Sequence, residues 1–400
     1  MNKKLSIIFA TLWLCTACST TENGLPITQS GSRYPFVAAT GDGGVLMSWF
    51  EKTDSVTWAL KWSEFKEGIW NNNKPITSGE PYFINWADFP SIFHLGGDTL
   101  AAHWLQKSGQ GPYDYDVKVV RSFDRGATWS EPVTPHRDGI KGEHGFVSFF
   151  RDMTNNDLGL IWLDGRNLGA GDDKNGYGAM NLYQSGFMSS GDLKWEMKLD
   201  DMVCECCPTS AVNTDNSLLR AYRDRSEAEI RDIKILRYAD GYWFEPYAVH
   251  NDDWKIVGCP VNGPKLAAQE NDIAIAWFTS PDNTPKVNVA FSVNEGASFE
   301  NPIRVDLNQP IGRVDLIWIS DEEIMVSWIE IGEETTNILI SIVAKNGSVG
   351  TPRIISEIAP GRVSGYPQMA RVEDQIFFTW TEGGEEGGIQ SKWIPLSVFR

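Results

Sequence analysis

A pattern of apolar and polar positions recurs along this 400-residue chain. Each copy begins with a short run at a Pro or apolar residue, crosses a turn, and continues into a β-type run that ends near an aromatic side chain. Residues 45–50, Val-Leu-Met-Ser-Trp-Phe, form such a run. The aromatic anchors of the seven copies are Trp49, Trp104, Trp162, Tyr222, Trp277, Trp328 and Trp380, spaced 55, 58, 60, 55, 51 and 52 residues apart. A period near 50 residues with several short strands per copy is typical of β-propeller blades, so we expect an all-β, seven-bladed β-propeller.

Short runs that contain Pro follow most copies. Residues 74–77 read Lys-Pro-Ile-Thr, and related runs occur at 131–134, 245–248, 301–304 and 351–354. Since Pro is tolerated at a sheet edge or at the first residue of a strand, we expect these runs to be the outer strands of the blades. The last copy has room for three strands, and residues 25–28 read Leu-Pro-Ile-Thr. We therefore expect the N-terminal strand to supply the fourth strand of the last blade and close the ring.

The N-terminus has the pattern of an export signal. Lys3 and Lys4 precede an apolar core at 5–14, which is too short to span a bilayer. The residues before Cys18 resemble the lipobox of bacterial lipoproteins, although Cys15 stands where Leu is usual. We expect Cys18 to be lipidated after cleavage; an ordinary cleaved signal is the alternative.

The expected organisation is a lipoprotein signal peptide at 1–17, a lipid-anchored tether at 18–24 and a single propeller domain at 25–400, exported to the cell envelope.

The net charge of −18 becomes about −20 once the two Lys of the signal are removed. An acidic chain is a poor ligand for nucleic acid or for an anionic membrane surface. We therefore expect no nucleic-acid partner, membrane contact only through the lipid, and a monomer.

One turn motif is complete at residues 122–129, which read Ser-Phe-Asp-Arg-Gly-Ala-Thr-Trp, and a degraded copy occupies 292–299. In this Asp-box, Asp124 is expected to bond nearby backbone N–H groups, Gly126 to take a positive φ, and Trp129 to pack between blades. We interpret the motif as structural, because turn chemistry alone accounts for the Asp.

The Asp-boxes, the outer Pro strands and Arg33-Tyr34-Pro35 together resemble the sialidase-like, Asp-box (BNR repeat) β-propeller superfamily. Segments 204–208 (Cys-Glu-Cys-Cys-Pro), 222–226, 229–232 and 258–264 look like a bacterial lipoprotein subgroup with a CxCCP motif. Sialidases have six blades, so a six-bladed ring is the alternative that the resemblance raises.

Sialidases hold the substrate carboxylate with three Arg, and use an Asp as acid/base and a Tyr nucleophile that a Glu makes more basic. The resemblance implies that Arg33 is one clamp, that Asp54 is the acid/base and that Tyr366 is the nucleophile. Glu229 would be the activating carboxylate. The remaining clamps would be Arg225 and Arg313, with Arg231 and Arg362 as competitors.

The loop that leads into the first strand of a blade (the lead-in loop) shares a rim with the loop between strands two and three. Lead-in loops bring Arg33, Tyr34, Trp86, Asp88, Glu143, His144, Cys204, Cys206, Cys207, Cys259, Arg313, Arg362 and Tyr366 to this rim. The other loops bring Asp54, Asp164, Arg166, Arg223, Arg225, Glu229 and Arg231.

Charged and aromatic groups around an axial pit suit a small polar ligand. We expect a sialidase-like exo-glycosidase or binder of acidic glycans; the alternative is a non-catalytic binding or assembly propeller.

Four cysteines, Cys204, Cys206, Cys207 and Cys259, lie on adjacent lead-in loops. Disulfides are the default in an exported chain, with three possible connectivities. Adjacent blades pack about 10 Å apart whereas a disulfide needs Cα atoms within about 7 Å, so a loop must lean across. The alternatives are free thiols and a zinc or copper site with His144 as a nitrogen ligand.

A Gly- and Asp-rich insertion at 164–177 lies on the same rim. Its oxygen ligands, Asp164, Asp172, Asp173 and Asn175, could bind calcium, although they lack the EF-hand pattern. A solvated loop is the simpler interpretation.

Overall fold

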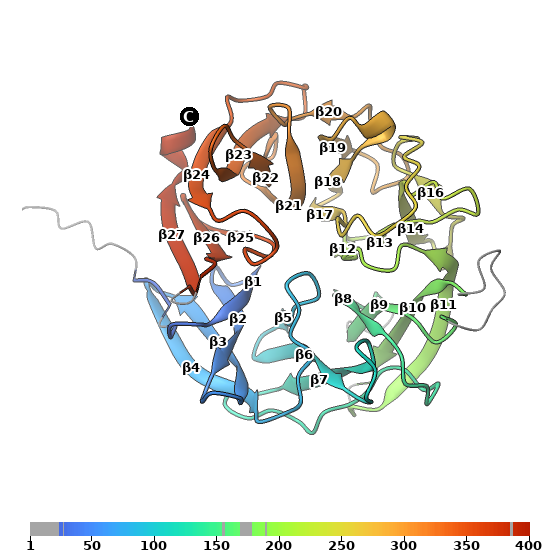
Figure 1. Ribbon diagram of the computed structural model, residues 1–400, viewed down its shortest axis with the longest axis vertical. Helices are drawn as coiled ribbons and strands as arrows, with labels where there is room; N and C mark the ends of the chain where they lie inside the picture. Colours follow the sequence, from blue (N-terminus) through green and yellow to red (C-terminus); the bar gives the residue numbers. More distant parts are fainter. Residues whose placement is uncertain (1–23, 27, 154–156, 169–177, 189, 385–386) are drawn as a thin grey trace, which may run out of the picture.

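Seven antiparallel sheets are arranged around one axis in the computed structural model (Figure 1). It describes residues 24–26, 28–153, 157–168, 178–188, 190–384 and 387–400. The seven-bladed propeller is thus confirmed, and the six-bladed alternative is not. The predicted signal peptide, Cys18 and the predicted calcium ligands Asp172, Asp173 and Asn175 lie outside the described residues.

The blades follow one another in chain order. The first contains β1 (Arg33–Ala39), β2 (Val45–Lys52), β3 (Trp58–Lys66) and β4 (Ile69–Ser78); the second contains β5 (Ser91–Gly96), β6 (Thr99–Lys107) and β7 (Tyr115–Ser122). The third contains β8 (His144–Arg151), β9 (Leu158–Asp164), β10 (Met180–Phe187) and β11 (Leu193–Val203). The fourth contains β12 (Ser210–Asn213), β13 (Ser217–Arg223), β14 (Ile233–Ala239), β15 (Tyr242–Trp243) and β16 (Tyr247–Ala248).

The remaining blades repeat the meander. The fifth contains β17 (Lys265–Gln269), β18 (Asp272–Thr279), β19 (Lys286–Ser292) and β20 (Ile303–Arg304). The sixth contains β21 (Pro310–Trp318), β22 (Glu323–Ile331), β23 (Thr336–Ala344) and β24 (Arg353–Ile358), and the seventh contains β25 (Gln368–Val372), β26 (Gln375–Thr381) and β27 (Ile389–Pro395). Two 3-10 turns, η1 (Pro281–Asn283) and η2 (Leu396–Phe399), complete the elements. A membrane-spanning helix is absent from the part of the chain that the structure describes.

The aromatic anchors lie on the second strand of each blade and are at most 3% exposed. In five blades the buried indole donates to a polar side chain two residues further along, as Trp162 Nε1 does to Asp164 Oδ2 at 2.7 Å. Residues i and i+2 share one face of a strand, so the acceptor satisfies an N–H that would otherwise be buried without a partner. In these five blades the anchor therefore recurs together with an acceptor two residues later, an acid in four of them and Gln106 in the fifth.

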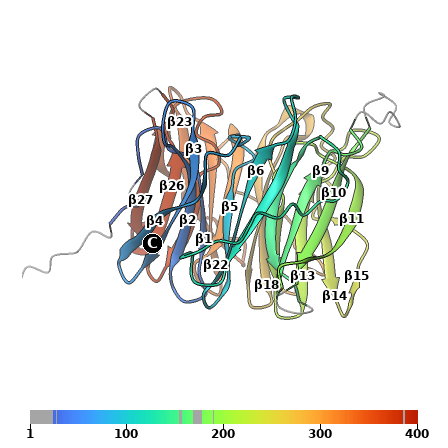
Figure 2. The ribbon, with the colours of Figure 1, turned by 90° about the horizontal axis from the view of Figure 1, so that it is seen from below.

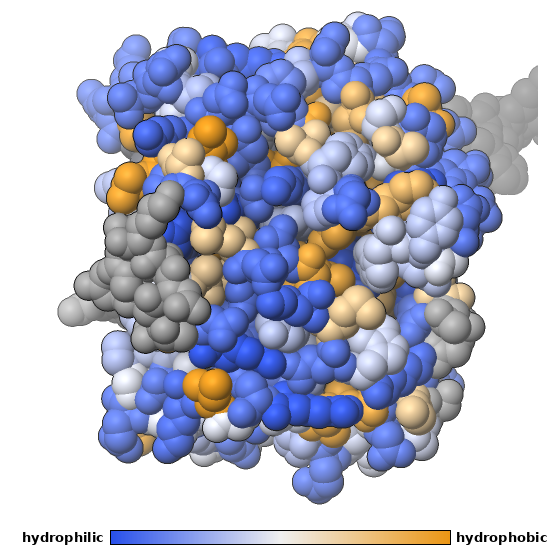
Figure 3. Space-filling model, turned by 90° about the vertical axis from the view of Figure 1, so that its right-hand side faces the viewer, coloured by the Kyte–Doolittle hydropathy of each residue, from blue (hydrophilic) through white to orange (hydrophobic). Residues whose placement is uncertain are grey.

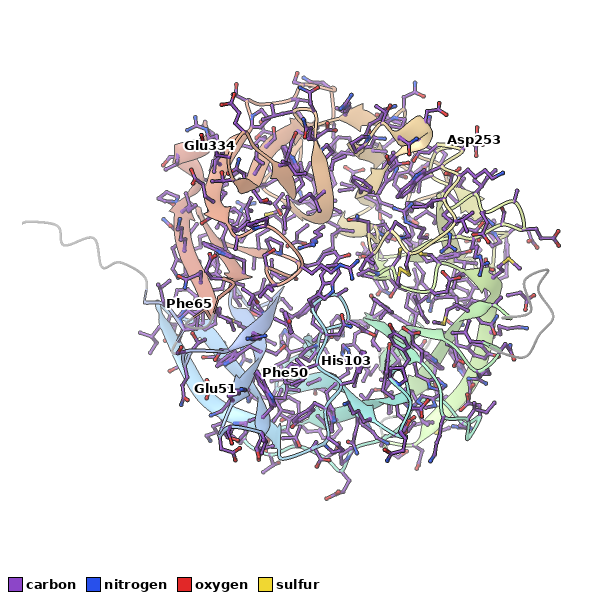
Figure 4. All side chains as sticks on the ribbon, viewed as in Figure 1. Phe50, Glu51, Phe65, His103, Asp253 and Glu334 are labelled. Carbon is purple, nitrogen blue, oxygen red and sulfur yellow. A yellow bond between two sulfur atoms is a disulfide. The ribbon has the colours of Figure 1, made fainter. Side chains whose placement is uncertain are left out.

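The core lies between the blades. One cluster, for example, joins Phe50 and Trp62 of the first blade to Ile92 and Trp104 of the second. Side chains fill these inter-blade spaces all around the ring (Figure 4), and a side view shows strands running between two rims (Figure 2). The outer side of the third to fifth blades mixes hydrophilic residues with scattered hydrophobic ones (Figure 3). Each blade is therefore stabilised by its neighbours, and ring closure matters to all of them.

Most of the predicted outer strands form. Residues of the Pro-containing runs belong to β4, β16, β20 and β24, whereas the run at 131–134 makes an isolated bridge between Val133 and Val119. At the closure, Gly31 N donates to Gly387 O at 2.8 Å and Trp393 Nε1 donates to Gly24 O at 3.2 Å. The N-terminal segment thus lies against the last blade as predicted. Single hydrogen bonds hold it there, and its described residues before Arg33 form no strand.

The Asp-box is a turn held by its own side chains. Asp124 accepts from Thr128 N at 2.9 Å and from Thr128 Oγ1 at 2.6 Å. Ser122 Oγ accepts from Gly126 N at 2.7 Å, where φ is 75°. Trp129 packs edge-on against Trp62 of the first blade at 6.1 Å. These contacts bear out the structural interpretation of Asp124, and they lie on the rim opposite the lead-in loops.

Candidate functional site

An axial cavity of about 520 Å³ is lined by the first strand of all seven blades. Most of its lining is apolar, and an ion pair between Lys265 Nζ and Asp315 Oδ1 at 2.8 Å crosses from the fifth to the sixth blade. The lead-in loops surround one end of this cavity, which we call the mouth. Tyr366 and Asp88 of these loops line it.

The mouth is shaped by backbone bulges at matching positions of three blades. Tyr34, Phe146 and Arg313 have φ of 56°, 54° and 56°, and the strand register shifts beside each of them. Each bulged N–H is bound by a side chain of the preceding blade around the ring: Tyr34 by Thr381 Oγ1 (2.9 Å), Phe146 by Asp88 Oδ1 (2.7 Å) and Arg313 by Asn262 Oδ1 (2.7 Å). Because bulges redirect a strand, these links position the side chains around the mouth.

An aromatic group lies at the mouth. Tyr366 stacks on Trp86, with ring centroids 6.1 Å apart, and donates its hydroxyl to Val261 O at 2.7 Å. The guanidiniums of Arg313 and Arg362 lie 4.4 and 5.7 Å from the Trp86 ring. Burial raises the pKa of Tyr366 far above the usual value. Trp86 is half-buried.

The three predicted clamp arginines have different surroundings. Arg313 donates to Ser364 Oγ, Gly365 O and Gly361 O at 3.0–3.2 Å. Arg225 binds two carboxylates, as described below. Arg33, half-buried on β1, has no hydrogen-bond or ion-pair partner among the described residues. The recorded contacts do not bring these three guanidiniums onto one point.

Asp54, the predicted acid/base, lies in the exposed loop between β2 and β3. Its Oδ1 accepts from Val56 N at 2.9 Å and from Thr57 N at 2.8 Å, and these donors lower its pKa. In this structure Asp54 therefore caps its own turn as a carboxylate.

Glu229, the predicted activator of Tyr366, belongs instead to an ion network above the cysteine loop. Arg225 donates to Glu229 Oε1 at 2.6 Å and to Glu205 Oε1 at 2.5 Å. Arg231 donates to Glu205 Oε2 at 2.6 Å and to Glu229 Oε2 at 3.0 Å. Two Arg thus hold two carboxylates. Burial opposes ionisation of Glu229, but its hydrogen bonds with Arg225 and Arg231 outweigh burial and lower its pKa.

A second acidic group lies beside this network. The Tyr115 hydroxyl is 3.2 Å from Asp88 Oδ2 and 3.0 Å from Glu143 Oε1. Burial, the largest effect, raises the pKa of Asp88 to about 8 and that of Glu143 to about 7. The charge of Glu205 also raises the pKa of Glu143, so the two carboxyls are within electrostatic reach of each other. A phenol carries one proton, so it can donate to only one of its two acidic neighbours. The contact between Tyr115 and the second carboxyl is a hydrogen bond only when that carboxyl is protonated and donates to the phenol oxygen.

The cysteines divide into two pairs. Cys206 and Cys259 form a disulfide between the fourth and fifth blades, with Cα atoms 5.9 Å apart, so the predicted bridge between adjacent lead-in loops is present. Cys204 and Cys207 are buried free thiols with sulfur atoms 2.7 Å apart. Burial would raise the pKa of Cys204, but the hydrogen bond with Cys207 and the charges of nearby arginines lower it to about 7.

His144 belongs to a different cluster. Its Nε2 lies 2.9 Å from Asp138 Oδ2 and 3.7 Å from Asp164 Oδ1, and its ring stacks on His136 at 3.7 Å. Two sets could hold a cation here, Asp116 with His136 and His144, and Asp138 with His144 and Asp164. Arg166 already pairs with Asp164 at 2.7 Å. The predicted five-residue zinc or copper set is thus divided between two places, with two of its thiols joined in the disulfide.

Sequence reasoning placed Asp88 and Glu143 on the rim but gave neither a role, and it omitted Tyr115 and Glu205. Glu205 lies inside the Cys-Glu-Cys-Cys-Pro motif, which was a usable signal. Tyr115 begins a third strand and gave none, because only the folded ring brings it between two lead-in loops.

No protein-family model matches this chain, and no curated protein matches it either. Among solved structures, it is similar to the Hadza microbial sialidase Hz136, with 13% identity and a TM-score of 0.52 over 87% of this chain and 75% of that one. It is similar to polysaccharide lyase Uly1, with 10% identity and a TM-score of 0.51 over 89% and 88%. A Streptococcus pneumoniae NanB sialidase mutant gives 10% identity and a TM-score of 0.50 over 89% and 84%. At these identities the similarity shows the fold.

Proposed function

We propose that this propeller binds an acidic glycan at the mouth of its axial cavity and hydrolyses a glycosidic bond there. Glu143 would be the general acid and Glu205 the partner carboxylate that acts as base or nucleophile. Tyr115 would be a positioning residue that holds Glu143.

The observation that carries this proposal is the unequal environment of two neighbouring carboxyls. Glu143 shares the single proton of Tyr115 with Asp88, whereas Glu205 accepts from two arginines at 2.5 and 2.6 Å. Glycosidases commonly need one protonated and one ionised carboxyl on either side of the scissile bond. Environments that separate two carboxyls in this way assign the acid and the base.

Binding groups are available on other lead-in loops of the same rim. The half-buried ring of Trp86 offers a stacking surface for a sugar, and guanidiniums form charge-assisted hydrogen bonds with carboxylates. Arg33 and Arg362 have no ion-pair partner among the described residues. An acidic sugar would supply the missing anion.

The comparisons support a carbohydrate substrate in general terms. The similar structures include two sialidases, a polysaccharide lyase and a Penicillium chrysogenum α-L-arabinanase with a TM-score of 0.50. The assignment of Tyr366 as nucleophile with Asp54 as acid/base stays a sequence-based prediction, and it competes with the Glu143 and Glu205 proposal.

The test is turnover of a panel of fluorogenic glycosides, including a sialoside and a glucuronide. We expect Glu143→Gln and Glu205→Gln each to lower kcat/KM about 10²- to 10⁴-fold, as loss of a general acid or base does. Glu131→Gln, on an exposed outer edge, is the matched control and should keep full activity. Activity that survives both rim variants but is lost in Tyr366→Phe would support the sialidase-like assignment instead. Binding without turnover of any glycoside would favour the non-catalytic propeller.

A further inference from the structure

Cys204, Cys206, Cys207 and Cys259 form one cluster of sulfur atoms that reaches from the surface to the interior. Cys259 is exposed and Cys206, its disulfide partner, is partly buried. Cys204 is 1% exposed, and its Sγ lies 4.0 Å from Cys206 Sγ and 2.7 Å from Cys207 Sγ. The sulfurs of Cys204, Cys206 and Cys207 all lie within 4.8 Å of one another, so two buried thiols are next to the disulfide, which is the position that exchanging thiols need.

We propose that this cluster is a thiol–disulfide exchange site, in which one disulfide moves between an exposed position, Cys206–Cys259, and a buried position, Cys204–Cys207. The observation behind it is the placement of a buried thiol pair directly behind an exposed disulfide. The proposal is independent of the glycosidase assignment.

The exchange proceeds in two steps. Cys204, as a thiolate, attacks Cys206 Sγ; the Cys204–Cys206 bond forms, the Cys206–Cys259 bond breaks, and Cys259 leaves as a thiolate that takes up the proton lost by Cys204. Cys207 then attacks Cys204 Sγ; the Cys204–Cys207 bond forms, the Cys204–Cys206 bond breaks, and the proton of Cys207 passes to the departing Cys206. One disulfide and two thiols are present at the start and at the end, so no external oxidant or reductant is required.

The surroundings favour a thiolate at Cys204. Arg223 and Arg231 are 1% and 2% exposed, and their charges act on Cys204. Arg223 donates to the main-chain oxygens of Asn262, Arg231 and Phe278 at 2.6–2.8 Å. These carbonyl acceptors leave its charge unneutralised, and a nearby cation stabilises a thiolate.

The two positions of the disulfide have different consequences. At Cys206–Cys259 it links residues 53 apart on two blades. At Cys204–Cys207 it closes only a short loop within one blade, leaves the fourth and fifth blades unlinked at the mouth, and exposes a thiol at Cys259.

The test maps disulfides in the purified full-length chain, held in a glutathione buffer so that two of the four cysteines Cys204, Cys206, Cys207 and Cys259 are thiols. After an acid quench, alkylation and digestion, mass spectrometry identifies the linked pairs. We expect both Cys206–Cys259 and Cys204–Cys207 peptides, in a ratio that is the same whether the sample starts fully reduced or fully oxidised. Finding Cys206–Cys259 alone, with Cys204 and Cys207 always alkylated, would overturn the proposal.

Two serine variants follow the steps separately, and circular dichroism confirms that each is folded. In Cys207→Ser the exchange stops at the Cys204–Cys206 disulfide, so a maleimide should label Cys259 in the native protein. In the double variant Cys204→Ser, Cys207→Ser no buried thiol is left to attack the disulfide, and Cys259 should stay unlabelled, with at least a tenfold difference between the two variants. Equal labelling of Cys259 in both would contradict the relay. Stoichiometric zinc or copper bound by four thiolates would also overturn it.

Discussion

The hydroxyl of Tyr366 donates to the main-chain oxygen of Val261 at 2.7 Å, joining residues 105 positions apart. This bond ties the lead-in loop of the seventh blade to that of the fifth across the mouth. Burial raises the pKa of Tyr366, whereas a nucleophilic side chain needs an adjacent base or a lowered pKa. In this arrangement Tyr366 is a neutral donor that holds the mouth together.

Tyr366→Phe should therefore reduce stability. The ring keeps its packing on Trp86 and Phe89, but the partly buried Val261 carbonyl loses its donor, which costs about 1 kcal/mol. Urea unfolding followed by tryptophan fluorescence measures the free energy of unfolding. Tyr242→Phe, at a 53% exposed tyrosine, should change it little. Equal stability of the two variants would mean that the bond does not hold the mouth.

The acidic pair around Tyr115 predicts a stability that falls as the pH rises. Folding raises the pKa of Glu143 from 4.5 to about 7, mainly through burial. The folded state therefore holds the proton more tightly, and this contribution is complete below pH 4.5 and lost as the pH rises through about 7. Between these pH values the free energy of unfolding should fall by roughly 1–3 kcal/mol less in Glu143→Gln than in the wild type. Asp88 still titrates in the variant, so part of the slope should remain. Identical pH profiles of wild type and variant would contradict the prediction.

The Asp-box turn predicts a costly glycine substitution. A Cβ added at Gly126, where φ is 75°, would lie 2.0 Å from the Trp62 ring. We expect Gly126→Ala to lower the free energy of unfolding by at least about 3 kcal/mol, since backbone strain and overpacking both act. Gly139 has φ of 69° with open space around it. Gly139→Ala therefore introduces the backbone strain without a clash, and we expect it to lower the free energy of unfolding by about 1 kcal/mol. A difference below about 1 kcal/mol between the variants in urea unfolding would show that the turn relaxes.

The disulfide between the fourth and fifth blades predicts a large loss when it is removed. A crosslink between residues 53 apart restricts the unfolded chain by about 4 kcal/mol in the loop-closure model. The double variant Cys206→Ser, Cys259→Ser should show a lower free energy of unfolding by about that amount. Wild-type protein unfolded in dithiothreitol should approach the variant. If the variant keeps wild-type stability, the bridge does not act on the unfolded state.

The seven-fold repeat could be predicted from local pattern because each blade needs the same residues at the same places. The buried indoles and their acceptors two residues later, such as Trp328 with Glu330 at 2.7 Å, are set by strand geometry alone. The roles of individual rim residues could not be predicted in the same way. Arg225 and Glu229 were separately assigned to a sialidase-like site, but they bind each other.

The sequence by itself determined the number of blades, the strand order and the rim to which the lead-in loops belong, because periodicity and turn chemistry are local properties. Only the tertiary structure decided which rim groups meet: Tyr115 with Asp88 and Glu143, Glu205 with two arginines, and Cys206 with Cys259. These contacts depend on how far each loop leans over the axis. That distance is set by bulges and by packing between blades, which no local pattern records.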